Sequence, residues 1–330
     1  MALSLRDAAF ALDAAGTDPW SLRTSVGIPV YPPLPPGPIS VKVVAGRFSP
    51  AGAALRTLAS GTANAWSHLN LATIVGEISD RLRDPLIMKQ QKTGLCGPFA
   101  ILMELARRDP VRYVIAAREL LETGALHCPG GRVITAESEL RQEPLTQVQT
   151  GQVDWLLGAT LRDDENIWED VDDDANGLET MTFWTEQRGW IRDVLDLSGG
   201  DWETCFWWGD VDCMKQAEAA VKAGGVAHLL IDANMLTPEP NDSEEDMWLR
   251  RSYHEAGKKP TAFPQNPTHS QDDDLPPDHW VAYLGGLNLG SDPDDDDPIT
   301  VLLWSWGSRF EVTGTVEAFT EYLYGVATGY

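Results

Sequence analysis

The segment QQKTGLCGPFA, residues 90–100, places a cysteine where an amphipathic helix is expected to begin. Residues 98–107 carry apolar side chains at helical spacing, and they start with a proline, which suits a first helical turn. Unpaired backbone N–H groups and the positive end of the helix dipole favour thiolate over thiol, which predicts a lowered pKa for Cys96 and a usable nucleophile. Gln90, six residues upstream, is close enough for its amide to join the Cys96 N–H in an oxyanion hole, with Gln91 as the competing choice.

Helical patterns dominate the chain before Gly225, and strand patterns dominate after it. Amphipathic periodicity predicts helices over residues 70–83, 98–107, 110–123, 148–161, 180–189 and 211–223. Compact apolar runs between turn residues predict buried strands over residues 226–231, 280–289 and 299–306. The sequence therefore predicts an α+β fold, with the helices first and the sheet last.

The expected organisation has three parts. Residues 1–69 form an N-terminal extension with a Pro-rich linker, 70–225 a mainly helical lobe with the nucleophile helix, and 226–330 an antiparallel sheet lobe. Residues 237–278 are rich in proline and charge and predict a long mobile insertion in the sheet lobe. Residues 291–298 hold five aspartates and two prolines, so we expect them to form a hairpin tip.

Three separated motifs resemble those of papain-like cysteine peptidases. The first is the Cys96 segment, the second is DHWVAYLGG at 278–286, with a histidine heading an apolar strand, and the third is SWG at 305–307. The resemblance implies a papain-like fold, in which a helical lobe carrying the Cys helix packs on an antiparallel sheet lobe carrying the His. It also implies that Cys96 is the nucleophile, His279 the base and Gln90 the oxyanion donor.

The chain departs from the papain pattern in two ways. Papain-like enzymes carry Asn just before Ser-Trp-Gly, whereas this chain has Trp304. The orienting group is then Ser305, which we name as the candidate third residue, or Asn288, or an aspartate of the 291–298 tip, or no residue at all in a Cys–His dyad. The separation between Cys96 and His279 also exceeds the about 130 to 150 residues typical of papain-like proteins, and the 237–278 insertion accounts for the excess.

The whole layout is more similar to papain-fold bacterial effector or toxin domains than to digestive peptidases. Such domains include cysteine peptidases, deamidases and transglutaminases, because the same thiolate and imidazolium also attack a glutamine carboxamide. The resemblance implies no cofactor, a protein substrate, and a cognate inhibitor or immunity protein as a partner. A catalytically inactive papain-like binding module, whose acidic face engages a basic partner, is the alternative from another class.

Composition excludes several other classes of protein. The net charge of −25 repels phosphate backbones, so nucleic-acid binding is not expected. No apolar run is long enough for a membrane span, and no secretory signal peptide is recognisable at the start. The four cysteines follow neither a disulfide framework nor a zinc pattern, which predicts reduced thiols and cytoplasmic work, or export without a classical signal peptide.

One further motif resembles half of a calcium-binding loop. Asp172, Asp174, Asn176 and Gly177 have the spacing of its first half, but Phe183 stands where a bidentate Glu is required. We therefore expect no metal site here, and a calcium-stabilised scaffold module is the weakest of the functional alternatives.

Overall fold

The computed structural model describes residues 50–89, 94–143, 150–165, 182–198, 201–204, 211–236, 250–255, 279–290 and 293–330. These residues cluster into two units. The described part of the first unit runs from 50 to 165 and includes Asp193–Asp196, and the second unit takes the remainder from 182 onward. The fold is α+β, as the sequence predicts: the first unit is built mainly from helices and the second around an antiparallel sheet.

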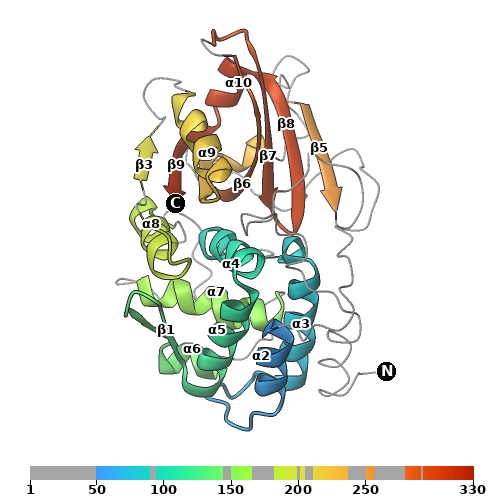
Figure 1. The fold of residues 1–330 in the computed structure, drawn as a ribbon, viewed down its shortest axis with the longest axis vertical. Coiled ribbons are helices and arrows are strands. Elements are labelled where there is room, and N and C mark those ends of the chain that lie inside the picture. The colour runs from blue at the N-terminus through green and yellow to red at the C-terminus, as the bar shows by residue number, and fades with distance from the viewer. Residues whose placement is uncertain are drawn as a thin grey trace. The chain divides into compact units, whose positions relative to one another are not determined.

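The first unit is a cluster of helices with one small hairpin (Figure 1). Its elements are α2 (Pro50–Ala59), α3 (Leu71–Arg83), the 3-10 helix η2 (Pro85–Ile87), α4 (Cys96–Arg108), α5 (Pro110–Thr123), β1 (Ala125–His127), β2 (Val133–Thr135), α6 (Ser138–Gln142) and α7 (Gln152–Glu165). Helix α4 packs on α5 and α7, and α2 packs on α3 and α5. Because α2 belongs to this cluster, the first unit begins before position 70, where the sequence suggested that the helical lobe starts.

Local signals explain where these helices begin and end. The Asn70 side chain accepts a hydrogen bond from the Thr73 N–H and caps α3, and the Asp109 side chain accepts one from the Arg112 N–H and caps α5. Helix α5 ends at Gly124, whose φ of 75° is the left-handed conformation that glycine adopts at little cost. The predicted helix over 110–123 is therefore confirmed in both bounds.

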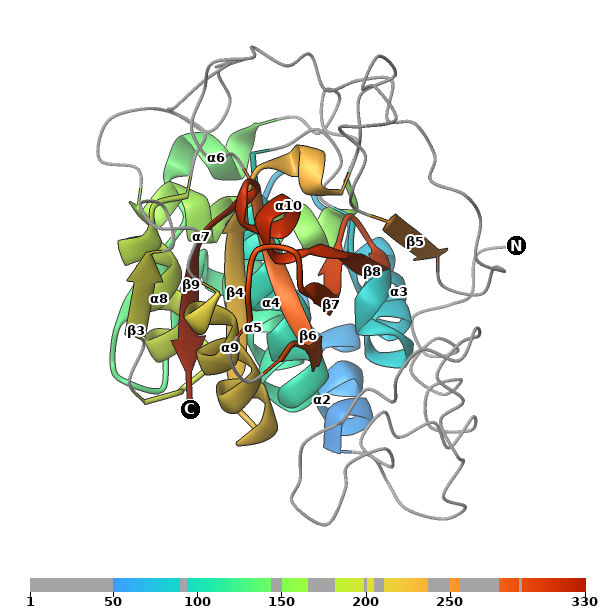
Figure 2. The same ribbon diagram turned by 90° about the horizontal axis from the view of Figure 1, so that it is seen from above.

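The second unit is built on a seven-stranded antiparallel sheet in the described part of the chain. The strands are β3 (Asp201–Thr204), β4 (Val226–Ile231), β5 (Arg250–Glu255), β6 (His279–Asn288), β7 (Pro298–Ser305), β8 (Ser308–Thr315) and β9 (Leu323–Gly329). Their order across the sheet is β3-β9-β4-β6-β7-β8-β5, which can be followed in Figure 2. The three strands predicted from apolar runs are β4, β6 and β7, and residues 293–297 connect β6 to β7 as the expected hairpin tip.

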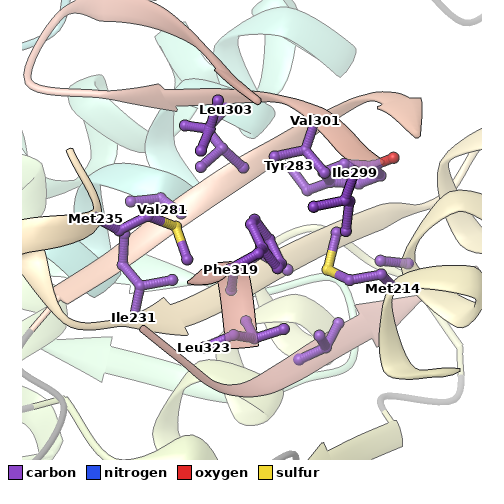
Figure 3. Close-up of a cluster of buried hydrophobic side chains, with 14 of the residues drawn as sticks. Met214, Ile231, Met235, Val281, Tyr283, Ile299, Val301, Leu303, Phe319 and Leu323 are labelled. Atoms are coloured by element: carbon purple, nitrogen blue, oxygen red, sulfur yellow. The ribbon is translucent and has the colours of Figure 1, made fainter. Parts of the chain in front are cut away.

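One face of this sheet carries the core of the second unit. The described helices of the unit are α8 (Trp184–Asp193), α9 (Asp212–Lys222), η4 (Ala233–Met235) and α10 (Val316–Thr320). Side chains of α9 and α10 meet alternate residues of the central strands, and Figure 3 shows Phe319 in the middle of this cluster, near Val281 and Leu323. Because α9 packs on β4, β6 and β9, it belongs to the sheet unit, although its periodicity grouped it with the preceding helices.

The 237–278 segment contains a strand that the sequence analysis did not predict. Strand β5 pairs along its whole length with β8, from Arg250 opposite Thr313 to Glu255 opposite Ser308. Its sequence, RRSYHE, has no apolar alternation and therefore gives no strand signal. The remainder of the segment lies outside the described residues. No helix among those described is long and apolar enough to cross a membrane.

Candidate functional site

Cys96 is the first residue of α4, in the first unit. Its helix begins at the N-cap residue Leu95, whose side chain makes no capping hydrogen bond, and the Phe99 N–H donates to the Leu95 carbonyl to close the first turn. Gly97 and Pro98 follow, and a proline in the first turn removes one N–H that a helix start would leave without a partner. The local sequence therefore fixes the helix start at the cysteine.

The electrostatics of this helix start suit a thiolate. Cys96 is a free thiol with only 5% of its surface exposed. The first turn of α4 holds no acidic residue, while Arg107 and Arg108 lie in the last turn, where they complement the negative end of the helix dipole. No carboxylate of the first turn therefore opposes a negative charge on the Cys96 sulfur.

His279 is the first residue of β6, in the second unit, and its side chain is buried. Its Nε2 lies 2.6 Å from Ser305 Oγ, at the end of the neighbouring strand β7. Ala282 pairs with Trp304, so His279 and Ser305 occupy the same end of the two strands. The structure thus brings together two of the residues that the sequence singled out.

The indole of Trp306 stacks on the imidazole of His279. The two ring centroids are 4.4 Å apart with an angle of 20° between the planes, and Trp306 in turn meets Phe310 edge to face. The imidazole therefore has a hydrogen bond at one nitrogen and an aromatic ring against one face. The SWG motif is visible in the sequence, but the contact between its tryptophan and His279 is not.

A strained two-residue turn supplies that indole. Ser305 pairs with Ser308, and the intervening Trp306 and Gly307 have φ values of 47° and 75°. Positive φ at both positions is the pattern of a type I′ hairpin turn, which ordinarily uses Asn-Gly. A bulky residue in this conformation costs on the order of 1–3 kcal/mol and marks sites where the surrounding structure holds the backbone.

The other candidates for the third residue lie elsewhere in the second unit. Asn288 ends β6 and the described aspartates of the tip precede β7, so both are at the opposite end of the strands from His279. Trp304 precedes Ser305 in the strand, so its side chain points to the opposite face of the sheet. Among the alternatives that lie in the described part of the chain, Ser305 is placed in contact with His279.

Several predicted residues lie outside the described part of the chain. They include both candidate oxyanion donors, Gln90 and Gln91, and the half calcium loop at 172–177. Within the described ranges, no group of three His, Cys, Asp or Glu side chains gathers as metal ligands would.

Two other cysteines are described. Cys128, in the β1–β2 turn, is a free thiol, and burial raises its pKa to about 11. Cys128 is therefore an inert thiol at neutral pH. Cys213, at the start of α9, is disulfide-bonded, so the expectation that all thiols are reduced is wrong for this residue. Spacing alone could not reveal this bond, because a disulfide depends on the approach of Cβ atoms in the fold.

The second buried histidine of the sheet unit has a structural role. His228 Nδ1 lies 2.6 Å from Gln187 Nε2, and both side chains are fully buried. An amide nitrogen can only donate, so this contact assigns the acceptor role to His228 Nδ1. His228 therefore joins α8 to β4.

The chain was compared with protein-family models, curated proteins and solved structures, and nothing matched.

Proposed function

We propose that this protein is a thiol hydrolase with a papain-like arrangement, which attacks an amide of a protein or peptide, as bacterial effectors and toxins of this kind do. The observation that supports the proposal most directly is the His279 imidazole, with Ser305 at Nε2 and Trp306 on its face. A histidine placed in this way at the head of a buried strand is oriented rather than merely packed. The helix start at Cys96 supplies the matching nucleophile.

The contact between His279 Nε2 and Ser305 Oγ is compatible with the tautomer that the chemistry requires, because a hydroxyl accepts a hydrogen bond as readily as it donates one. When Nε2–H donates to Ser305 Oγ, the lone pair of the neutral imidazole is on Nδ1. Nδ1 is then the atom that exchanges protons with Cys96, while Ser305 holds the ring and accepts the N–H. Ser305 in this way replaces the amide that papain-like enzymes use.

The proposed reaction is acyl transfer through a thioester. His279 takes the proton of Cys96, and the sulfur attacks the carbonyl carbon of the amide. The Cys96 N–H and the Gln90 amide stabilise the oxyanion, and the C–N bond breaks as His279 protonates the departing amine. Water then attacks the thioester, giving the acid and the free thiol.

The identity of the departing and accepting groups distinguishes three reactions of the same site. Cleavage of a backbone amide gives a peptidase, and loss of ammonia from a glutamine carboxamide gives a deamidase. Attack on the thioester by an amine instead of water gives a transglutaminase. We propose peptide hydrolysis first, and deamidation or transamidation as the alternatives.

The disulfide at Cys213 bears on where such an enzyme works. Disulfides persist in oxidising compartments and are rare in a reducing cytosol. We therefore infer that the protein works in an oxidising compartment rather than in the cytoplasm. A protein substrate and a cognate inhibitor or immunity protein remain the proposed partners.

The test is the reactivity of Cys96 in the full chain. Iodoacetamide labelling at each cysteine is followed by peptide mass spectrometry from pH 5 to 10, in the wild type and in H279A. We expect Cys96 to label with a midpoint below the ordinary thiol value of about 8.5 and H279A to lose this advantage. Assays of peptide cleavage, ammonia release and amine incorporation then distinguish the three reactions, with C96A as the inactive variant and C128A as the matched control.

Two results would count against the enzyme. An ordinary thiol profile at Cys96 in the folded wild type would remove the activated nucleophile. A biological effect of the protein that survives in C96A would favour the catalytically inactive binding module instead.

A further inference from the structure

Helix α7 and Thr150, which precedes it, contact Lys89 and the start of α4 at Cys96. Upstream, the Thr150 hydroxyl donates a hydrogen bond of 2.7 Å to the carbonyl of Lys89, the residue before Gln90. Downstream, Gly158 of α7 lies against the side chains of Leu95 and Phe99, which flank Cys96. Thr150 is two residues before α7 begins, so a single short stretch of chain contacts both Lys89 and the start of α4.

Gly158 allows an approach that no other residue would permit. A Cβ at this position would stand 2.8 Å from Phe99 Cε2 and 3.4 Å from Leu95 Cδ1. The first distance is shorter than real Cβ contacts, so the Phe99 ring would have to move. Glycine within a helix lowers stability by about 1 kcal/mol relative to alanine. At Gly158 this loss is offset by the close packing of α7 against α4.

The two side chains in contact with Gly158 belong to the first turn of α4, which sets the position of Cys96. Leu95 is the N-cap residue of α4, and its carbonyl accepts the Phe99 N–H at 2.9 Å. Both side chains are buried, so a displaced Phe99 ring has no open space to enter. A shift of this ring is therefore transmitted to the backbone around Cys96.

Helix α7 is itself held firmly against α3. Glu77 accepts a hydrogen bond of 2.7 Å from the Val153 N–H, in the first turn of α7. Arg81 forms a two-pronged ion pair with Asp154, whose side chain is almost fully buried. These contacts fix the end of α7 that lies next to Thr150, so the helix can act as a rigid support.

We propose that Thr150 and Gly158 are positioning residues for the thiol chemistry, and that α7, with the residue just before it, is the support that holds Lys89 and the start of α4 at Cys96. This inference rests on the proposed function. Thr150 holds Lys89 through its hydroxyl, and Gly158 holds the start of α4 through close packing.

The test measures the pH profile of Cys96 labelling in G158A and T150V. The matched controls are G76A, because nothing lies within 4 Å of a Cβ added at Gly76 of α3, and T150S, which keeps the hydroxyl. Full-length protein is labelled with iodoacetamide, and labelling of the inert Cys128 reports unfolding in the same sample. A purely structural role would change stability without moving the labelling midpoint of Cys96.

We expect the labelling midpoint of Cys96 to rise by about one pH unit in G158A, which lowers labelling roughly tenfold at pH values well below both midpoints. T150V should lower that labelling roughly threefold, and both controls should stay within about twofold of wild type. Unchanged profiles in folded G158A and T150V would overturn the inference while leaving the enzyme proposal intact. An ordinary thiol profile in the wild type would instead reject the enzyme proposal.

A further variant keeps the test valid if G158A exposes Cys128. In G158A/F99L the ring atoms that the added Cβ would meet are gone. Recovery of the wild-type labelling profile in this double variant would support the inference, and a profile that stays shifted in a folded protein would contradict it.

Discussion

The two units hold their candidate catalytic groups by different means. In the helical unit, Cys96 depends on the start of α4 and on the packing of α7 against that helix. In the sheet unit, the contacts of His279 include a hydrogen bond to Ser305 and a stacked ring, that of Trp306. The nucleophile is therefore held by the packing of helices, and the base by a hydroxyl and an aromatic ring beside it. Substitutions far from Cys96 in the helical unit should act mainly on stability, whereas those at the start of α4 and those beside His279 should also change how the reactive group is placed.

The largest effect is expected at the ion pair between Arg81 and Asp154. D154A leaves the Arg81 guanidinium, which is only 12% exposed, without its carboxylate, so the free energy of unfolding should fall by about 3–5 kcal/mol. Urea denaturation measures this change. D80A, which removes the exposed partner of Arg83, is the matched control and should change stability by less than about 1 kcal/mol. A loss of similar size in both variants would show that α7 is not anchored by the buried pair.

The next effect is expected at Ser305. S305A leaves the buried His279 Nε2 without its hydroxyl partner, which should lower the free energy of unfolding by about 1–3 kcal/mol. S305T keeps the hydroxyl and serves as the matched variant. Nitrogen chemical shifts of the His279 ring should show the Nε2–H tautomer in the wild type and S305T, and a mixture in S305A. The same tautomer in all three proteins would remove Ser305 from its proposed role.

A smaller net effect on stability is expected at Trp306. W306G relieves a φ of 47° but loses the indole that covers His279, so the two contributions should nearly cancel, within about 1 kcal/mol. The orientation of His279 should nevertheless suffer, and labelling of Cys96 at pH 7 should fall. W306N, which also tolerates positive φ, should behave in the same way. Full labelling in both variants would show that the Trp306 indole is not needed to orient the base.

The smallest effect is expected in the pH dependence of the helical unit. Burial raises the pKa of Glu77 above its usual 4.5, partly offset by the Val153 N–H that its carboxylate accepts. The folded protein then binds the Glu77 proton more tightly than the unfolded chain does, so this group makes stability fall as the pH rises above 4.5. E77Q should remove that slope while keeping an oxygen for the Val153 N–H. A slope above pH 4.5 that is identical in both proteins would contradict this assignment.

The sequence predicts a helix or strand best where capping or turn residues occur at both of its ends. Helix α5 has an Asp cap, a proline at its first position and a glycine at its end, and its predicted bounds match the structure. Strand β4 is an unbroken apolar run between turn residues, and it was also predicted with its observed bounds. Strands β5, β8 and β9 contain polar or glycine residues, so their sequences have no clear strand pattern. They are stabilised by pairing with their neighbours in the sheet.

The candidate site is only partly readable from sequence for a related reason. Cys96 and His279 stand out because each heads a patterned element. The partner of His279 depends on the register of β6 and β7, which β-bulges near Gly285 shift. No spacing rule selects Ser305 over Asn288 in advance. The contact between Gly158 of α7 and Phe99 of α4 likewise cannot be predicted from the sequence of either helix.

The position of β9 has a consequence for how the protein is made. This strand, residues 323–329, lies between β3 and β4, so the last stretch of this sequence fills an inner place in the sheet. During translation β3 and β4 leave the ribosome before β9. The edges with which they pair to β9 are therefore exposed to solvent until β9 has been synthesised. Expression at low temperature or with a chaperone that covers strand edges should therefore raise the yield of folded protein.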